Sequence, residues 1–361
     1  MSLDVTLGHR LGAFALEATF VAPPGVTVLF GRSGSGKTSV VDAVAGLIRP
    51  QRGRIAVDGE VLCDTDRGIW TPPHRRRLGV VFQDGRLFPH LTVRGNLDYG
   101  RRFSGQGRDR ALEARIVEML GIGALLDRRP GGLSGGERAR VGIGRALLAH
   151  PRLIVADEPL AALDQARKAE IMPYFERLRD EVAVPILYVS HDAAEVARLA
   201  TTVVALEGGR VLAAGPAAEI LADPNVVPAG IRAAGAVLEV RVARHHPDGL
   251  SELDAGGVAL FVPRVERPAG ATIRVRIPAQ EVILSLEPPR GLSALNVLPG
   301  RIEAIRAGEG PGVLVSLATP GGTVLARITR RSAERMELAV GGSAHAVVKS
   351  VAIAREDLGG R

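Results

Sequence analysis

One eight-residue segment, GRSGSGKT at residues 31–38, constrains the fold more than any other part of the chain. It matches the pattern G-x-x-x-x-G-K-[ST], follows the apolar run TVLF (27–30) and precedes the helical stretch SVVDAVAGLI. A strand, a glycine-rich turn and a helix in this order point consecutive backbone N–H groups at one anion, and the helix N-terminus adds partial positive charge. The segment therefore predicts a phosphate-binding loop on an α/β sheet.

The two residues that end this loop have separate expected roles toward a nucleoside triphosphate. Lys37 would reach the outer phosphates, and the Thr38 hydroxyl would bind Mg²⁺. The rest of the loop would surround the phosphates with its backbone. The residues expected to bind the nucleotide are Gly31, Arg32, Ser33, Gly34, Ser35, Gly36, Lys37 and Thr38.

Two adjacent carboxylates follow a second apolar run, LIVA at residues 153–156. Such a strand delivers them to its carboxyl end, where open α/β sheets bind ligands. Asp157 would hold Mg²⁺ through water, and Glu158 would polarise the water that attacks the γ-phosphate. A lone Asp-Glu pair is commonly a solvated turn, but the phosphate loop in the same chain favours the catalytic interpretation.

The pattern of apolar and polar residues changes near residue 236. Before it, strand-like runs such as PILYVS (185–190) alternate with helical patterns, which predicts a mainly parallel sheet covered by helices. After it, short runs such as ATIRVRIP alternate apolar and polar residues between Gly/Pro clusters, which predicts an all-β, OB-like barrel. The expected division is residues 1–232, a β-rich connecting segment at 236–290 and a barrel module at 291–355.

Composition excludes several classes of protein. The apolar share of 46% and the charged share of 24% are typical of globular chains and exclude wholesale disorder. One cysteine, Cys63, allows neither an intrachain disulfide nor a zinc cluster. The net charge of +7 is mild for 361 residues, so nucleic acid is not expected as a partner. No run of 18 apolar residues occurs, so any membrane role would come through a partner.

The segment LSGGERARVGIGRALL (133–148) adds a second anion-binding surface. Ser134, Gly135 and Gly136 open a helix, where a hydroxyl and bare backbone amides form a cradle for an anion. One γ-phosphate does not require both cradles from a single chain.

This segment resembles the signature of ABC transporter ATPases. Five features follow the family order over residues 1–230: the phosphate loop, Gln83 in VFQDGRLFPHLTV, Ser134–Glu137, the Asp157–Glu158 pair followed by ALD (162–164), and His191 in YVSHD. The resemblance implies that two copies dock head to tail. Each ATP would then lie between the phosphate loop of one copy and Ser134, Gly135, Gly136 and Glu137 of the other.

The same resemblance implies roles for three further residues. Gln83 would contact Mg²⁺ and the attacking water on the loop that faces a membrane partner. His191 would contact the γ-phosphate and orient the water, and Asp164 would signal across the dimer. The residue that stacks on adenine is left unassigned, with Phe14 and His9 as candidates.

The segments TPPHRRRLG and DGRLFPHLTVRGNLDYG, with GLSALNVLPGRI (291–302) and ARITRRSAERMELAVGG (326–342), resemble molybdate importer ATPases that carry a C-terminal Mop/TOBE-like module. The implied protein uses ATP and Mg²⁺ and works as a homodimer at the cytoplasmic face of the cell membrane. Its partners would be integral permease subunits and, indirectly, a periplasmic or extracellular substrate-binding protein. Sulfate, tungstate or a sugar are alternative cargoes, and a soluble ABC ATPase acting on DNA or ribosomes is a third hypothesis.

Three C-terminal residues offer the donors that a tetrahedral oxyanion requires. Ser293, Ser332 and Lys349 supply hydroxyls and a cation. Ser332 is expected to start a short helix, and Lys349 to lie in an apolar strand. The competing interpretation is a turn at Ser293 and Asn296, a helix cap at Ser332 and a solvated Lys349; Leu295, where the family often has Arg, favours it. For the run Arg75–Arg77 we expect a solvated face or contacts with nearby groups.

Overall fold

The computed structural model describes residues 2–82, 85–104, 109–161, 163–181, 184–223, 226, 234–307, 310–354 and 357–360. The chain divides into two compact units, Met1–His191 with Leu199–Ala214 and Asp192–Arg198 with Gly215–Arg361. Gln83, one of the expected site residues, lies outside the described residues. The domain boundary expected at residues 232–238 falls partly outside the described residues and stays a prediction.

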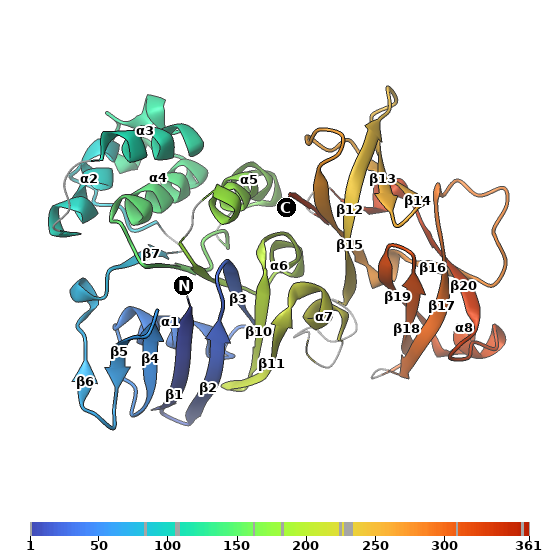
Figure 1. The fold of residues 1–361 in the computed structure, drawn as a ribbon, viewed down its shortest axis with the longest axis horizontal. Helices are drawn as coiled ribbons and strands as arrows, with labels where there is room; N and C mark the ends of the chain where they lie inside the picture. Colours follow the sequence, from blue (N-terminus) through green and yellow to red (C-terminus); the bar gives the residue numbers. More distant parts are fainter. Residues whose placement is uncertain are drawn as a thin grey trace. The chain divides into compact units, whose positions relative to one another are not determined.

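The first unit is built on an eleven-stranded sheet in the order β6-β5-β4-β1-β2-β11-β10-β3-β9-β8-β7 (Figure 1). Its strands are β1 (Leu3–Leu11), β2 (Phe14–Ala22), β3 (Val26–Phe30), β4 (Arg52–Val57), β5 (Glu60–Asp64), β6 (Ile69–Trp70), β7 (Leu78–Phe82), β8 (Leu153–Asp157), β9 (Ile186–Ser190), β10 (Thr202–Glu207) and β11 (Arg210–Pro216).

The two halves of this sheet pair differently. Strands β10, β3, β9, β8 and β7 pair in parallel, whereas β2, β1, β4, β5 and β6 pair antiparallel. The expectation of a mainly parallel sheet is therefore correct only for the half that carries the phosphate loop. β3 and β9 are buried at every position, as expected for strands with helices on both faces, whereas β2 alternates buried and exposed residues.

Helix α1 (Lys37–Ala45) packs into the apolar core of this sheet. Three other helices, α2 (Val93–Ser104), α3 (Arg110–Met119) and α4 (Gly135–Leu148), lie together in Figure 1 as a helical subdomain. The remaining helices are α5 (Gln165–Glu181), α6 (Ala193–Leu199), α7 (Ala217–Ala222) and α8 (Arg330–Arg335). In the part of the chain that the structure describes, no helix combines the length and apolar character needed to cross a membrane.

The second unit contains two five-stranded antiparallel sheets, in the orders β14-β13-β12-β15-β21 and β16-β20-β17-β18-β19. Their inward residues form one shared apolar core. The strands are β12 (Gly235–His245), β13 (Leu250–Ala255), β14 (Val258–Pro263), β15 (Thr272–Pro278), β16 (Ile283–Ser285), β17 (Asn296–Ala307), β18 (Gly312–Thr319), β19 (Gly322–Thr329), β20 (Ser343–Val348) and β21 (Leu358–Gly360). The expected fold class, a P-loop α/β domain followed by an all-β region, is confirmed.

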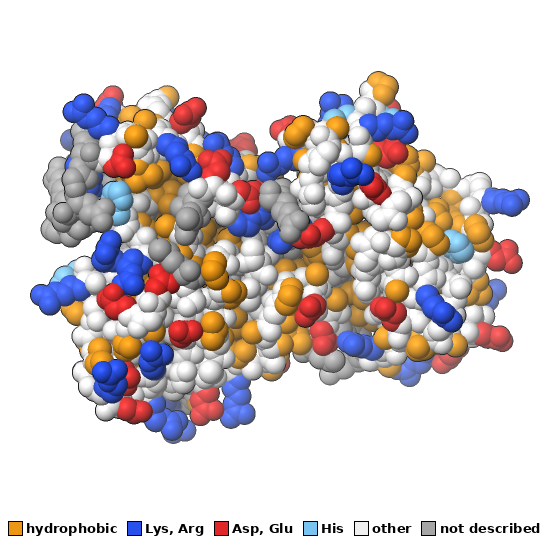
Figure 2. Space-filling view, in the orientation of Figure 1, with side chains coloured by type: hydrophobic (Ala, Val, Ile, Leu, Met, Phe, Trp, Pro, Cys, Tyr) orange, Lys and Arg blue, Asp and Glu red, His pale blue; other side chains and the backbone are white. Residues whose placement is uncertain are grey.

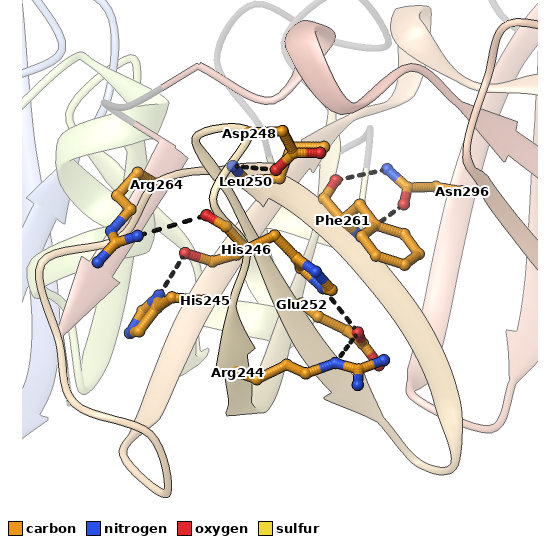
Figure 3. A network of polar contacts seen from close by, with 10 residues as sticks. Arg244, His245, His246, Asp248, Leu250, Glu252, Phe261, Arg264 and Asn296 are labelled. Carbon is orange, nitrogen blue, oxygen red and sulfur yellow. Dashed lines mark hydrogen bonds and ion pairs between the residues drawn. The ribbon is translucent and has the colours of Figure 1, made fainter.

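Polar contacts hold together the outer end of the β12–β13 hairpin (Figure 3). Glu252 accepts hydrogen bonds from Arg244 Nε at 2.7 Å and pairs with His246 Nε2 at 2.9 Å. These partners lower the pKa of the Glu252 carboxyl, and the hydrogen bond from Arg244 has the largest effect.

On the face drawn in Figure 2, positive and negative side chains are interspersed rather than gathered by sign.

Candidate nucleotide site

The loop between β3 and α1 can form only with glycine at specific positions. Gly36 caps α1 with a φ of 102°, and a Cβ there would lie 3.1 Å from Leu16 Cδ1 and 3.2 Å from the Phe14 ring. A Cβ at Gly31 would lie 2.5 Å from the Leu206 carbonyl oxygen. Positive φ and close backbone approach are the two conditions that select glycine, so the motif spacing reports this loop geometry.

Lys37 begins α1 and turns its ammonium back into the loop. Its Nζ donates to the carbonyl oxygens of Gly31 at 2.7 Å and Arg32 at 2.8 Å, and it lies 3.9 Å from Glu158 Oε1. Burial lowers the pKa of Lys37, while the negative charges of Glu158 and Asp157 oppose that shift. A phosphate placed in the loop would supply the further negative charge that this buried cation lacks.

Asp157 ends β8 beside the start of α1. Burial raises the pKa of Asp157, with smaller contributions from Glu158 and Asp42. The nearby Thr38 hydroxyl lowers the pKa of the Asp157 carboxyl, against the larger effect of burial. Its Oδ1 is buried without a hydrogen-bond partner among the described residues. Mg²⁺ prefers oxygen ligands, and here a buried carboxylate oxygen without a hydrogen-bond partner lies next to a hydroxyl. These residues therefore fit that ion.

Glu158 and His191 meet at the ends of neighbouring strands. β8 and β9 pair in parallel, so their carboxyl ends lie at the same edge of the sheet. His191 Nδ1 is 3.4 Å from Glu158 Oε2. The structure thus brings together Lys37, Thr38, Asp157, Glu158 and His191, which the sequence places up to 154 positions apart (191 minus 37).

A cavity of about 410 Å³ opens over Lys37, Thr38, Asp157 and Glu158. Its polar wall includes Ser33, Lys37, Thr38, Asp157 and Glu158. Phe14 and Leu11 form an apolar wall, and Leu11 is 43% exposed. An apolar surface beside a phosphate cradle suits the flat face of a nucleobase. Phe14 was a sequence candidate, but Leu11 was missed; its position at the end of a strand is the only local signal.

The second cradle is formed at the N-terminus of α4. Ser134 Oγ accepts from the Glu137 backbone N–H at 3.2 Å, and Glu137 Oε2 accepts from the Ser134 N–H at 2.7 Å. These reciprocal bonds, led by the one from the Ser134 backbone, lower the pKa of Glu137. The Ser134 hydroxyl and Glu137 therefore hold the helix end in place. A separate cavity of about 280 Å³ borders Ser134, Gly136 and Glu137.

Asp164, expected to signal between copies, caps the start of α5. Its Oδ1 accepts from the Arg167 N–H at 2.9 Å.

Gln83 lies outside the described residues, but the loop after it contacts α4. Arg145 donates to the carbonyl oxygens of Arg86 at 2.7 Å and Gly85 at 3.0 Å.

The three candidate oxyanion residues have different surroundings in the second unit. Ser332 lines a cavity of about 450 Å³, whereas Ser293 and Lys349 are exposed and are not among its lining residues. The expectation that Ser332 starts a helix is wrong, because Thr329 caps α8 by accepting from the Ser332 N–H at 3.1 Å. Lys349 follows β20 instead of lying within it, because the chain turns there into a short 3-10 helix. An oxyanion site formed by these residues stays a prediction.

Comparison with known proteins places this arrangement in a family. A model described as ABC transporter matches residues 19–161, and one described as TOBE domain matches residues 292–354. The molybdenum import ATP-binding protein ModC of Mesorhizobium japonicum is 54% identical, and the alignment covers 99% of this chain and 98% of that protein. The chain belongs to the ABC transporter ATP-binding proteins. ModC of Rhizobium meliloti, another member, is 52% identical, with 98% and 99% covered.

Solved ABC cassettes share the fold of the first unit. A nucleotide-free ATP-binding cassette matches with a TM-score of 0.54 and 24% identity, covering 63% of this chain and 98% of the other. A dimeric cassette in a post-hydrolysis state, bound to ADP and Pi, matches with a TM-score of 0.50 and 26% identity, covering 60% and 99%. Both matches cover a share of the chain close to that of its nucleotide-binding unit.

Proposed function

We propose that this chain is the ATP-hydrolysing subunit of a molybdate importer. The observation that carries the ATPase assignment is the convergence of Lys37, Asp157 and Glu158 on one cavity, with His191 beside Glu158. The import assignment rests on relatives named for molybdenum import that match this chain over nearly its whole length. The chain would act from the cytoplasmic face of the membrane, on integral permease subunits that receive cargo from an external binding protein.

Each residue at the site has its own role in the proposed hydrolysis of ATP. The loop at residues 31–36 and Lys37 would hold the phosphates and compensate their charge. Glu158 Oε2 would accept a hydrogen bond from the attacking water, and His191 would orient that water and the γ-phosphate. Thr38, Asp157 and Gln83 would hold Mg²⁺, which when bound neutralises charge on the phosphates. Transfer of the γ-phosphate to water depends on positioning and electrostatics. Small displacements of these groups would therefore slow hydrolysis rather than weaken ATP binding.

A second copy of the chain would complete the site. The amide groups at the N-terminus of α4 are presented at an exposed, capped helix end, which suits an anion brought by a partner. We assign Ser134, Gly135, Gly136 and Glu137 to the nucleotide of the other copy. A solved cassette of this fold is dimeric with ADP and Pi, which supports a homodimer.

ATPase activity in the reconstituted complex tests the proposal. The full importer, in vesicles, would receive binding protein that is empty or loaded with molybdate, tungstate or sulfate. We expect stimulation by the molybdate-loaded protein over the empty one. Equal hydrolysis with and without molybdate would contradict the assignment to molybdate. Stimulation by the sulfate-loaded protein alone would show that sulfate is the transported substrate.

A further inference from the structure

The last strand of the chain packs against the helix that follows His191. β21 joins the sheet of the second unit by pairing with β15, with Gly359 opposite Arg274. On its other side, Gly359 faces α6. A Cβ at Gly359 would lie 3.0 Å from Arg198 Cγ and 3.2 Å from both Arg198 Cα and Cβ. Glycine therefore lets the strand lie directly on the helix backbone.

Buried contacts hold both partners of this packing in place. On the strand side, Asp357 precedes β21 and accepts from Arg276 of β15 at 3.0 Å, and both side chains are largely buried. On the helix side, Val196, Ala197 and Leu199 are almost fully buried. Close-packed elements of this kind transmit a displacement instead of absorbing it.

Helix α6 begins at Ala193, two residues after His191. Asp192 caps the helix, with its Oδ1 accepting from the Ala194 N–H at 2.9 Å. Since Asp192 is the next residue after His191, the position of α6 sets where the backbone of His191 leaves β9. Arg198 lies seven residues after His191, about 10 Å along a helix. Packing at Gly359 is thus connected through one short rigid element to the imidazole beside Glu158.

We propose that the C-terminal strand β21 is a positioning element for His191, acting through the contact of Gly359 with α6. The proposal rests on the proposed function, because it assumes that His191 serves ATP hydrolysis. A side chain at residue 359 would push α6 and shift His191 relative to Glu158, now 3.4 Å away. The phosphate loop belongs to the other compact unit, so we expect nucleotide binding to be preserved.

Steady-state ATP hydrolysis by the reconstituted complex tests the idea. We expect Gly359→Val to lower kcat by about tenfold, in line with the cost of a sub-ångström misplacement, while the KM for ATP stays within about twofold. Gly359→Ala should show a smaller loss in the same direction. The matched control is Gly312→Val in β18, where a Cβ would lie 3.5 Å from the flexible end of Arg327. It should leave kcat unchanged.

A double-mutant cycle separates positioning from general damage. In a His191→Ala background, Gly359→Val should lower kcat no further, because its effect passes through the missing imidazole. An equal loss in both backgrounds, or a KM increase in place of the kcat loss, would overturn the proposal. If the valine variant fails to fold, Gly359→Ala takes its place in the cycle. Normal activity of His191→Ala alone would instead contradict the role of His191 in the proposed function.

Discussion

Glu158 adopts a left-handed backbone conformation, with a φ of 42°, directly after β8. For a residue other than glycine this conformation is costly, and it persists only where the surroundings determine it. Here the carboxylate lies between Lys37 Nζ at 3.9 Å and His191 Nδ1 at 3.4 Å. The strained backbone therefore directs Glu158 into the cavity, which suits the role proposed for it in hydrolysis.

Replacement of Glu158 by glutamine tests this role. We expect Glu158→Gln to lower kcat by about 10²- to 10³-fold, because the amide keeps the shape but does not accept a proton. ATP affinity should stay within about threefold, since the phosphate loop is unchanged. The measurements are steady-state hydrolysis in the assembled complex and equilibrium ATP binding. Glu17→Gln, at an exposed carboxylate, is the control, and near-normal turnover of Glu158→Gln would refute the assignment.

Asp157 provides a test by pH. Burial raises its pKa above that of the unfolded chain, so the folded carboxyl holds a proton more tightly than the unfolded one. The ionised form therefore destabilises the fold at neutral pH, and this cost disappears as pH falls below the ordinary carboxyl range. We expect Asp157→Asn, without nucleotide or Mg²⁺, to unfold at a higher temperature than the natural protein at neutral pH.

The difference in unfolding temperature should shrink toward zero below about pH 3, where both states of the natural carboxyl are largely protonated. The same variant should lose Mg²⁺-dependent ATPase activity. Thermal unfolding across a pH series measures the first effect. An asparagine variant that is less stable at neutral pH would contradict our account of this carboxylate.

At the scale of elements, one arginine secures the end of α1 opposite the phosphate loop. Arg76 is 1% exposed and donates from Nη1 to the carbonyl oxygens of Ala43 at 2.7 Å and Val44 at 2.8 Å. Its guanidinium lies 4.5 Å from the centre of the Trp70 ring. The Ala43 carbonyl also accepts from the Gly46 N–H, so Arg76 adds a charged donor to the carbonyls of the last helical turn. Of the two alternatives expected for the run Arg75–Arg77, a solvated face or contacts with nearby groups, Arg76 shows the second.

Loss of this guanidinium should weaken the fold. We expect Arg76→Met to lower the free energy of unfolding by about 2 to 4 kcal/mol, because buried carbonyl oxygens lose a charged donor. The neighbouring Arg75 is exposed, so Arg75→Met is a matched control with an expected change within about 0.5 kcal/mol. Denaturant titration measures both. Equal stability of the two variants would show that the buried contacts contribute nothing.

In the second unit, the Asn296 side chain pairs with the backbone of Phe261 as a neighbouring strand would. Its side chain is fully buried, accepts from the Phe261 N–H at 2.6 Å and donates to the Phe261 carbonyl at 2.9 Å (Figure 3). We expect Asn296→Ala to lower the free energy of unfolding by about 2 kcal/mol, since both backbone groups are left unpaired. Ser293→Ala, at an exposed position, should change it little. Denaturant titration measures the difference, and an unchanged midpoint for Asn296→Ala would contradict this role.

At the scale of the whole molecule, the sequence predicts what local chemistry determines. The phosphate loop, the carboxylates after β8 and the fold class follow from motifs and periodicity within a few residues. The antiparallel half of the first sheet, the burial of Arg76 and the pairing of Phe261 with Asn296 depend on partners far along the chain. Nothing in a run of three arginines tells which one will find carbonyl acceptors on α1, so these features emerged only from the fold.

A structure of the Glu158→Gln protein loaded with ATP and Mg²⁺ tests the central claim most directly, because this variant should bind nucleotide without consuming it. We predict a pair of chains in which each triphosphate lies within hydrogen-bond distance of Lys37 from one copy and Ser134 from the other. A loaded structure in which Ser134 is remote from every triphosphate, with no more pairing than in the empty protein, would contradict the account.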